Sequence, residues 1–118
     1  MTERLSAIAG EAAQLADAGR DLESAAAYSV AADLLEETGW AMHARLARIA
    51  ARKMLVVHWA KTRFPDDRID QWCVSSVRAP QYRHKRTGES WLFRVVRRGP
   101  DVYARVDRRN RIREVERA

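Results

Sequence analysis

Apolar side chains recur at steps of three and four over the first half of the chain, and this spacing predicts helices. A first helix begins after Thr2, which can act as its cap, and ends at Gly19. A second helix has Asp21 as its cap and ends at Gly39. The predicted inward positions of the two helices are Leu5, Ile8, Ala12, Leu15, Leu22, Ala25, Tyr28, Ala32 and Leu35. The pattern therefore predicts an antiparallel helical hairpin.

A third helix is predicted from Trp40 to about Arg63, because Pro65 cannot continue a helical hydrogen-bond ladder. Proline and the two acids after it suit a first helical turn, so a short helix is predicted from Pro65 to Trp72. The inward residues expected on the third helix are Met42, Leu46, Ile49, Met54 and Val57. Tryptophans bury large apolar areas and are expected in the core, apart from Trp40 at the helical turn.

After Ser76 the apolar period changes to two, which is typical of strands. The predicted strands are residues 82–86, 90–97, 102–106 and 111–115, separated by the turn signals Thr87-Gly88, Gly99-Pro100 and Arg109-Asn110. An antiparallel meander is the most economical connection. The predicted fold class is therefore α+β: a three-helix N-terminal part, made of a helical hairpin plus a third helix, packed on a C-terminal meander of three to four strands.

The chain has 118 residues, close to the commonest size of one domain. We expect a single domain over 1–118, with a helical part at 1–64, a connector at 65–80 and a basic sheet at 81–118. No apolar run approaches the roughly 20 residues of a membrane span, and no signal core follows Met1. A lone cysteine, Cys73, cannot form an internal disulfide, so the expected location is the cytoplasm, without membrane contact.

Charge separates along the chain. Residues 1–40 contain two arginines and eight acids, whereas residues 41–118 contain 20 Lys and Arg and eight acids. A basic half predicts nucleic acid or an acidic protein surface as partner. The bias toward 19 Arg over three Lys, with 20 Ala, is equally what a GC-rich genome encodes, which favours an actinobacterial or bacteriophage source. The clustering of arginine is therefore more informative than its abundance.

The first cluster is a basic face of the predicted sheet. Alternation along the strands places on one surface Arg83, Lys85, Arg94, Arg105, Arg111 and Arg113, with Tyr103 among them. Cations spaced along a sheet can neutralise phosphates, and an exposed ring can stack on an unpaired base. This pattern predicts binding of single-stranded nucleic acid or RNA with little sequence preference. The competing interpretation is a solvated face that protects a sheet edge from aggregation.

A second cluster is a stripe on the third helix, formed by Arg45, Arg48 and Arg52 at steps of three and four. It could hold a phosphate backbone beside the sheet. The alternative is charge pairing with Glu36 and Glu37 across the helices.

The acidic first 40 residues have two interpretations. They are the solvated sides of two helices, or they dock a basic partner. In the second case the protein is an interaction module or an inhibitor that docks on a larger bacterial host protein, and a phage is the natural source of such an inhibitor. Self-association through acidic and basic ends is a further alternative.

Signals for catalysis and cofactors are weak. His43, His58 and His84 with Cys73 do not have metal-finger spacing, and no phosphate-binding glycine loop or serine elbow occurs in the chain. We therefore predict no catalytic residue, no metal and no cofactor, and a binding protein rather than an enzyme.

Two partial resemblances remain. Gly19, Ser24, Tyr28 and Ala31 fall near a glycine, small, aromatic, small pattern, so the hairpin resembles a tetratricopeptide repeat over about one repeat, with no second copy. The C-terminal half resembles, in outline, small ribosome-dependent toxin ribonucleases, which implies RNA cleavage by His84, Lys85, Arg94, Tyr103 and Arg105. The chain departs from that family because no strand precedes its first helix and its helical part is long.

Overall fold

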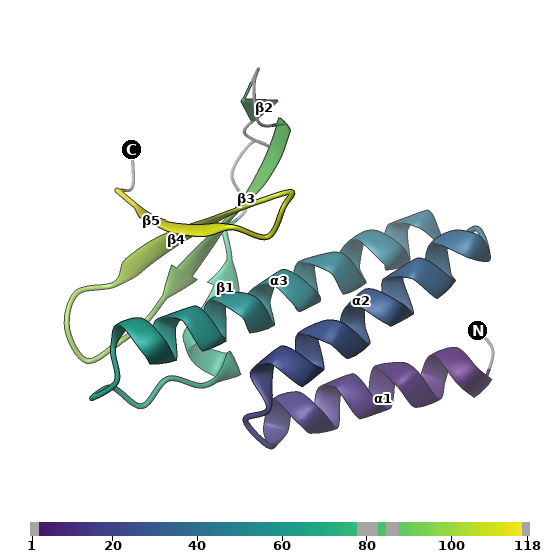
Figure 1. The fold of residues 1–118 in the computed structure, drawn as a ribbon, viewed down its shortest axis with the longest axis horizontal. Coiled ribbons are helices and arrows are strands. Elements are labelled where there is room, and N and C mark those ends of the chain that lie inside the picture. Colours follow the sequence, from purple (N-terminus) through teal and green to yellow (C-terminus); the bar gives the residue numbers. More distant parts are fainter. Residues whose placement is uncertain (1–2, 78–82, 85–87, 117–118) are drawn as a thin grey trace. The chain divides into compact units, whose positions relative to one another are not determined.

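A computed structural model describes residues 3–77, 83–84 and 88–116 (Figure 1). Three helices come first, α1 (Glu3–Asp17), α2 (Asp21–Glu37) and α3 (Ala41–Arg63). They are followed by a 3₁₀ turn (Gln71–Cys73) and the strands β1 (Val74–Ser76), β2 (Arg83–His84), β3 (Gly88–Val95), β4 (Val102–Asp107) and β5 (Ile112–Val115). Helices followed by an antiparallel sheet confirm the α+β class. The chain divides into two compact units, residues 1–55 and 56–118, and the expectation of a single domain stays a prediction.

The helical unit contains α1, α2 and the first part of α3. Gly19 and Gly39 adopt φ angles of 74° and 84°, the left-handed conformation that ends a helix and that glycine adopts without steric cost. Asp21 was expected to cap α2, but it is the first helical residue, and Arg20 takes the cap position. The expected Thr2 cap lies outside the described residues.

Small side chains hold α1 and α2 together. Ser24 is fully buried, and its hydroxyl donates a hydrogen bond of 2.7 Å to the Ala12 carbonyl on α1. Ala12 and Ala32 are also fully buried, so the two backbones approach closely. α2 lies between α1 and α3 (Figure 1), and Leu5, Leu35 and Ala44 form a small core from all three helices.

The first turns of α3 are oriented differently from the prediction. Met42 and Leu46, expected inward, are 75% and 59% exposed, whereas Ala44 and Ala51 are buried. The helix therefore packs through its alanines, which permit close approach, and its long side chains lie on another face. Farther along, Met54 is buried as expected. Val57 is buried as well, and Ile49 is half-buried.

The connector differs from the predicted helix at 65–72. Its helical turn is shorter and later, and the Asp70 carboxylate caps it by accepting a 2.8 Å hydrogen bond from the Trp72 amide. β1 follows immediately and was not predicted, because three residues are too few to show a period. Trp72 was expected in the core but is 80% exposed, whereas Trp40 is 43% exposed, as expected for a surface tryptophan.

In the second unit, the sheet has the order β1-β3-β4-β5, with every neighbour antiparallel, and β2 pairs with the start of β3. The meander from β3 to β5 agrees with the prediction, and β1 adds a strand on the other side of β3. One face is apolar and buried, and it contains Val74, Phe93, Val95, Val102, Ala104 and Val106.

The last turns of α3 belong to the same unit as the sheet. Val56, Val57 and Ala60 are fully buried there. Arg63 at the helix end donates to a Glu114 carboxylate oxygen on β5 at 2.9 Å. Arg97 lies over the Phe64 ring at 4.1 Å and donates Nε–H to Asp67 at 2.8 Å. A cation–π contact and an ion pair therefore link the end of β3 to the segment that follows α3.

We expect Ser24→Ala to lower the free energy of unfolding by about 1 kcal/mol, because a buried hydrogen bond between two helices is lost. Ser29→Ala is the matched control. The Ser29 hydroxyl bonds to Ala25 of its own helix, and alanine has the higher helix propensity, so stability should change by less than about 0.5 kcal/mol. Urea denaturation followed by circular dichroism measures both. Equal effects of the two substitutions would show that the Ser24 bond contributes nothing.

Candidate functional site

The face of the sheet opposite the buried one carries a cluster of arginines. Because side chains alternate along a strand, burial of Phe93 and Ala104 places their sequence neighbours on the other side. Cross-strand pairing aligns Arg94 with Tyr103, Leu92 with Arg105, and Arg105 with Arg113. We define the arginine face by these residues: Leu92, Arg94, Tyr103, Arg105 and Arg113. Of the predicted site residues, three arginines and the tyrosine thus share one surface.

The arginines of this face differ in how their charge is compensated. Arg94 donates two hydrogen bonds to the Asp101 carboxylate, one from Nε at 2.7 Å. The hydrogen bond to Asp101, together with its negative charge, raises the pKa of Arg94 above its ordinary value. Its guanidinium is therefore engaged by a carboxylate of the same unit, and it is a weaker candidate for binding an external anion than the sequence suggested.

Arg105 and Arg113 differ from Arg94 because they are paired with each other across two strands. They are directly opposed across β4 and β5, where paired Cβ atoms are about 5 Å apart, and like charges at that distance are unfavourable. Arg105 is half-buried and donates a 2.9 Å hydrogen bond to the Ser90 hydroxyl, a neutral acceptor. Arg113 is exposed and forms no ion pair with any residue that the structure describes. The pair therefore places two arginine side chains next to each other on β4 and β5.

The turn from β4 to β5 adds further arginines beside this pair. Asp107 organises the turn, because its Oδ1 accepts the backbone N–H groups of Arg109 at 2.8 Å and Arg111 at 3.0 Å. Asn110 completes it with a φ of 62°, a left-handed conformation that asparagine tolerates. The Arg111 side chain bonds Asp107 at 3.1 Å. The side chains of Arg108 and Arg109 at the tip are exposed, and neither is ion-paired within the described part of the chain.

Of the other predicted residues of this site, Arg83 belongs to β2. The backbone of Arg83 pairs with Glu89 of β3, which extends the sheet at that end. Lys85 lies outside the described residues, so its place on the basic face stays a prediction.

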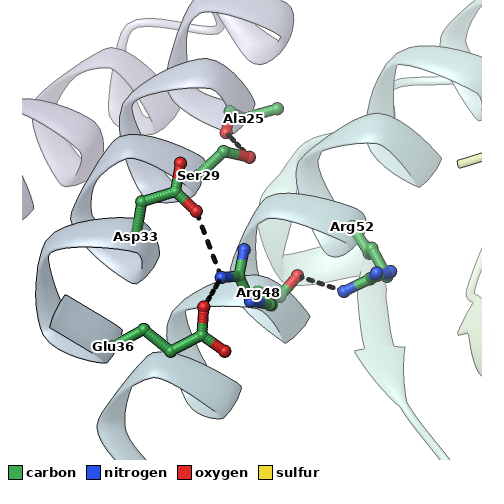
Figure 2. A network of polar contacts seen from close by, with 6 residues as sticks. All are labelled: Ala25, Ser29, Asp33, Glu36, Arg48 and Arg52. Carbon is green, nitrogen blue, oxygen red and sulfur yellow. Dashed lines mark hydrogen bonds and ion pairs between the residues drawn. The ribbon is translucent and has the colours of Figure 1, made fainter. Parts of the chain in front are cut away.

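The stripe on α3 is built differently. Figure 2 shows Arg48 directed toward Asp33 and Glu36 of α2, with an Nη2–Oδ1 distance of 3.1 Å to Asp33 and a shorter contact to Glu36. Partial burial by itself would lower the pKa of Arg48, but the hydrogen bonds to the two carboxylates outweigh it and raise the pKa. The observed partners are Asp33 and Glu36, not the expected pair of Glu36 and Glu37. Charge pairing between helices, the alternative interpretation of the stripe, therefore describes Arg48.

Arg52, another member of the stripe, does not point the same way as Arg48. Arg52 is half-buried and donates Nη1–H to the Arg48 carbonyl at 3.4 Å, on a side away from Asp33 and Glu36 (Figure 2). Arg45 is exposed. The spacing therefore does not bring the guanidinium groups of Arg48 and Arg52 together, and the place of Arg45 in a shared binding surface stays a prediction.

Other chemistry finds little support in the described part of the chain. No group of three or more His, Cys, Asp or Glu side chains there is placed to hold a metal ion, and none of the helices described is both long and apolar enough to cross a membrane. Of the residues implied by the ribonuclease resemblance, Lys85 is outside the described residues and Arg94 is bonded to Asp101. Comparison with protein-family models, curated proteins and solved structures gave no match to this chain.

Asp107 gives this site a pH dependence. Its hydrogen bonds from the backbone N–H groups of Arg111 and then Arg109 lower the pKa of Asp107 below its ordinary value of 3.8. Because the pKa is depressed on folding, the stabilisation is complete above the unfolded value and is lost as pH falls through the folded value. The stability difference between the wild type and Asp107→Asn should be largest above about pH 5 and should shrink steadily as the pH falls below the ordinary carboxyl value of 3.8. Chemical denaturation across this range measures it, and a constant difference would contradict the assignment.

Proposed function

We propose that the protein is a binding protein that takes up single-stranded nucleic acid, DNA or RNA, on the arginine face and the adjoining β4–β5 turn. The observation that carries this proposal is the register that sets Arg105 directly opposite Arg113. Two arginines opposed in this way can contact one phosphate together, through charge-assisted hydrogen bonds from both guanidinium groups. The exposed Arg108 and Arg109 at the turn extend the same positive surface by two more cations.

The charge of the second unit supports a polyanion as ligand. Residues 56–118 contain 16 Lys and Arg and eight acids, a formal charge of +8 in 63 residues. Proteins that neutralise phosphates gain affinity mainly by releasing condensed counterions, which needs cations but no deep cavity. A solvent-facing sheet surface with several arginines satisfies that requirement.

Tyr103 supports a preference for unpaired bases. It lies on the arginine face between the compensated Arg94 and the pair formed by Arg105 and Arg113. An aromatic ring beside cations can stack on a base while the phosphates on either side contact guanidinium groups. Such stacking requires an unstacked base, and it depends little on which base is present.

Binding of a labelled 12-nucleotide random single-stranded RNA, and of the DNA equivalent, tests the proposal by fluorescence anisotropy over a salt series. Affinity should fall as salt rises, with a log–log slope of about −0.7 for each phosphate contacted. Arg105→Gln with Arg113→Gln should make the slope shallower by about 1.4. Absent binding at low salt, or an affinity indifferent to salt, would overturn the proposal.

The matched control is Arg4→Gln with Arg20→Gln, which removes the same charge from two exposed arginines of the helical unit. This variant should keep the wild-type slope. If both double variants lose affinity equally, binding reflects net charge alone and the arginine face is not the site.

Tyr103→Leu should weaken binding of the RNA probe by about fivefold or more, since stacking contributes roughly 1–3 kcal/mol per base, while the salt slope stays unchanged. Tyr103→Phe should retain the wild-type affinity because the ring remains. Circular dichroism of both variants verifies that the sheet is intact. A loss that is the same for leucine and phenylalanine would rule out stacking as the role of this residue.

A further inference from the structure

The helical unit contains an apolar groove of about 250 Å³ that the proposed binding by the sheet does not use. All three helices line it, and its principal residues are Leu5 and Ala9 of α1, Tyr28 and Leu35 of α2, and Leu46 and Ala50 of α3. Apart from the Tyr28 hydroxyl and the His43 ring, the lining is apolar. The lining residues run from Tyr28 to Leu35 on α2 and from His43 to Ala50 on α3, and each stretch rises about 10 Å, or two helical turns.

The rim of this groove on α3 is apolar and faces solvent. Leu46 in the lining is 59% exposed, and Met42, one turn earlier on the same side of the helix, is 75% exposed. Contiguous exposed apolar side chains are unusual on a surface and mark interaction sites. The packing of α3 through Ala44 and Ala51 is what leaves these long side chains outside.

Acidic residues flank the groove along the sequence of α1 and α2. Glu3 and Glu37 are exposed, and each is two residues from a lining leucine, Leu5 or Leu35, which meet in one small core. At the other end, burial and then the nearby Asp17 carboxylate raise the pKa of the Tyr28 phenol, so Asp17 lies close to the lining. Across α1 and α2 there are eight acids and one arginine.

We propose that this groove binds an amphipathic helix of a partner protein, with apolar side chains on one face over about two turns and Lys or Arg at both ends. An apolar stripe at spacing i, i+3, i+4 and i+7 spans about two helical turns, which matches the length of this groove. The basic ends complement the acidic surface of α1 and α2, which includes Asp17 near Tyr28. The proposal is independent of the arginine face, since all of these residues belong to the first unit.

A designed probe tests this with the full-length protein. The probe is a fluorescein-labelled 16-residue helical peptide with Leu at the four stripe positions and Lys at both ends, and a second peptide has Glu in place of every Lys. Fluorescence anisotropy should give one-to-one binding of the Lys peptide at least about tenfold tighter than the Glu peptide. Equal affinity for the two peptides would overturn the proposal.

Two glutamate substitutions separate the groove from general charge attraction. Leu46→Glu places a carboxylate in the lining, whereas Leu22→Glu changes a leucine that is 51% exposed and outside the lining. Each adds the same negative charge, which by itself would strengthen binding of a basic peptide. We expect Leu46→Glu to weaken binding about tenfold or more and Leu22→Glu to leave it unchanged or slightly tighter. If both variants bind the Lys peptide as well as the wild type does, the groove is not the site.

A second copy of the chain is the competing occupant. Sedimentation equilibrium of the wild type and of Leu46→Glu distinguishes it. A monomeric wild type supports the proposal, whereas a concentration-dependent dimer that Leu46→Glu abolishes would assign the groove to self-association and overturn it.

Discussion

Burial of one face of the sheet determines what the other face carries. Phe93, Val95, Ala104 and Val106 are fully buried, and a slip of one residue in either strand would move its apolar set into solvent and its arginines into the core. The cost of such a slip, several buried side chains at about 1.5–3 kcal/mol each, far exceeds the repulsion between Arg105 and Arg113. The hydrophobic register therefore imposes the opposed arginines, and the surface charge follows from the core.

The arginine side chains of this protein have several different roles. Arg48 links α2 to α3 through two carboxylates, and Arg97 joins the end of β3 to Phe64 and Asp67. Arg94 is held by Asp101. These residues stabilise their own units, whereas Arg113 and the turn arginines face solvent. Counting arginines thus overstates the positive surface available to a ligand, and the partners of each guanidinium have to be considered one by one.

The sequence predicts the helices, the meander and the shared face of Arg94, Tyr103, Arg105 and Arg113 because long periodic segments and strand alternation are local properties. β1 escapes prediction because it is three residues long and exists only by pairing with β3. The other incorrect predictions concern tertiary packing, which the local sequence pattern does not determine. A helix with alanines on one side and long apolar residues on another can pack through either, and α3 packs through Ala44 and Ala51. For the same reason the groove could not be predicted, and carboxylate partners such as Asp101 depend on loop geometry that spacing does not encode.

Under the proposed function, anion binding by the opposed arginines is linked to folding. An anion that settles between Arg105 and Arg113 binds only where β4 and β5 are in register, so it recognises the native chain and not the unfolded one. By thermodynamic linkage such an ion raises apparent stability by RT ln(1 + [L]/Kd). Sulfate or phosphate in a buffer would then partly substitute for the proposed nucleic-acid ligand, and the measured stability of the sheet would depend on which anion is present.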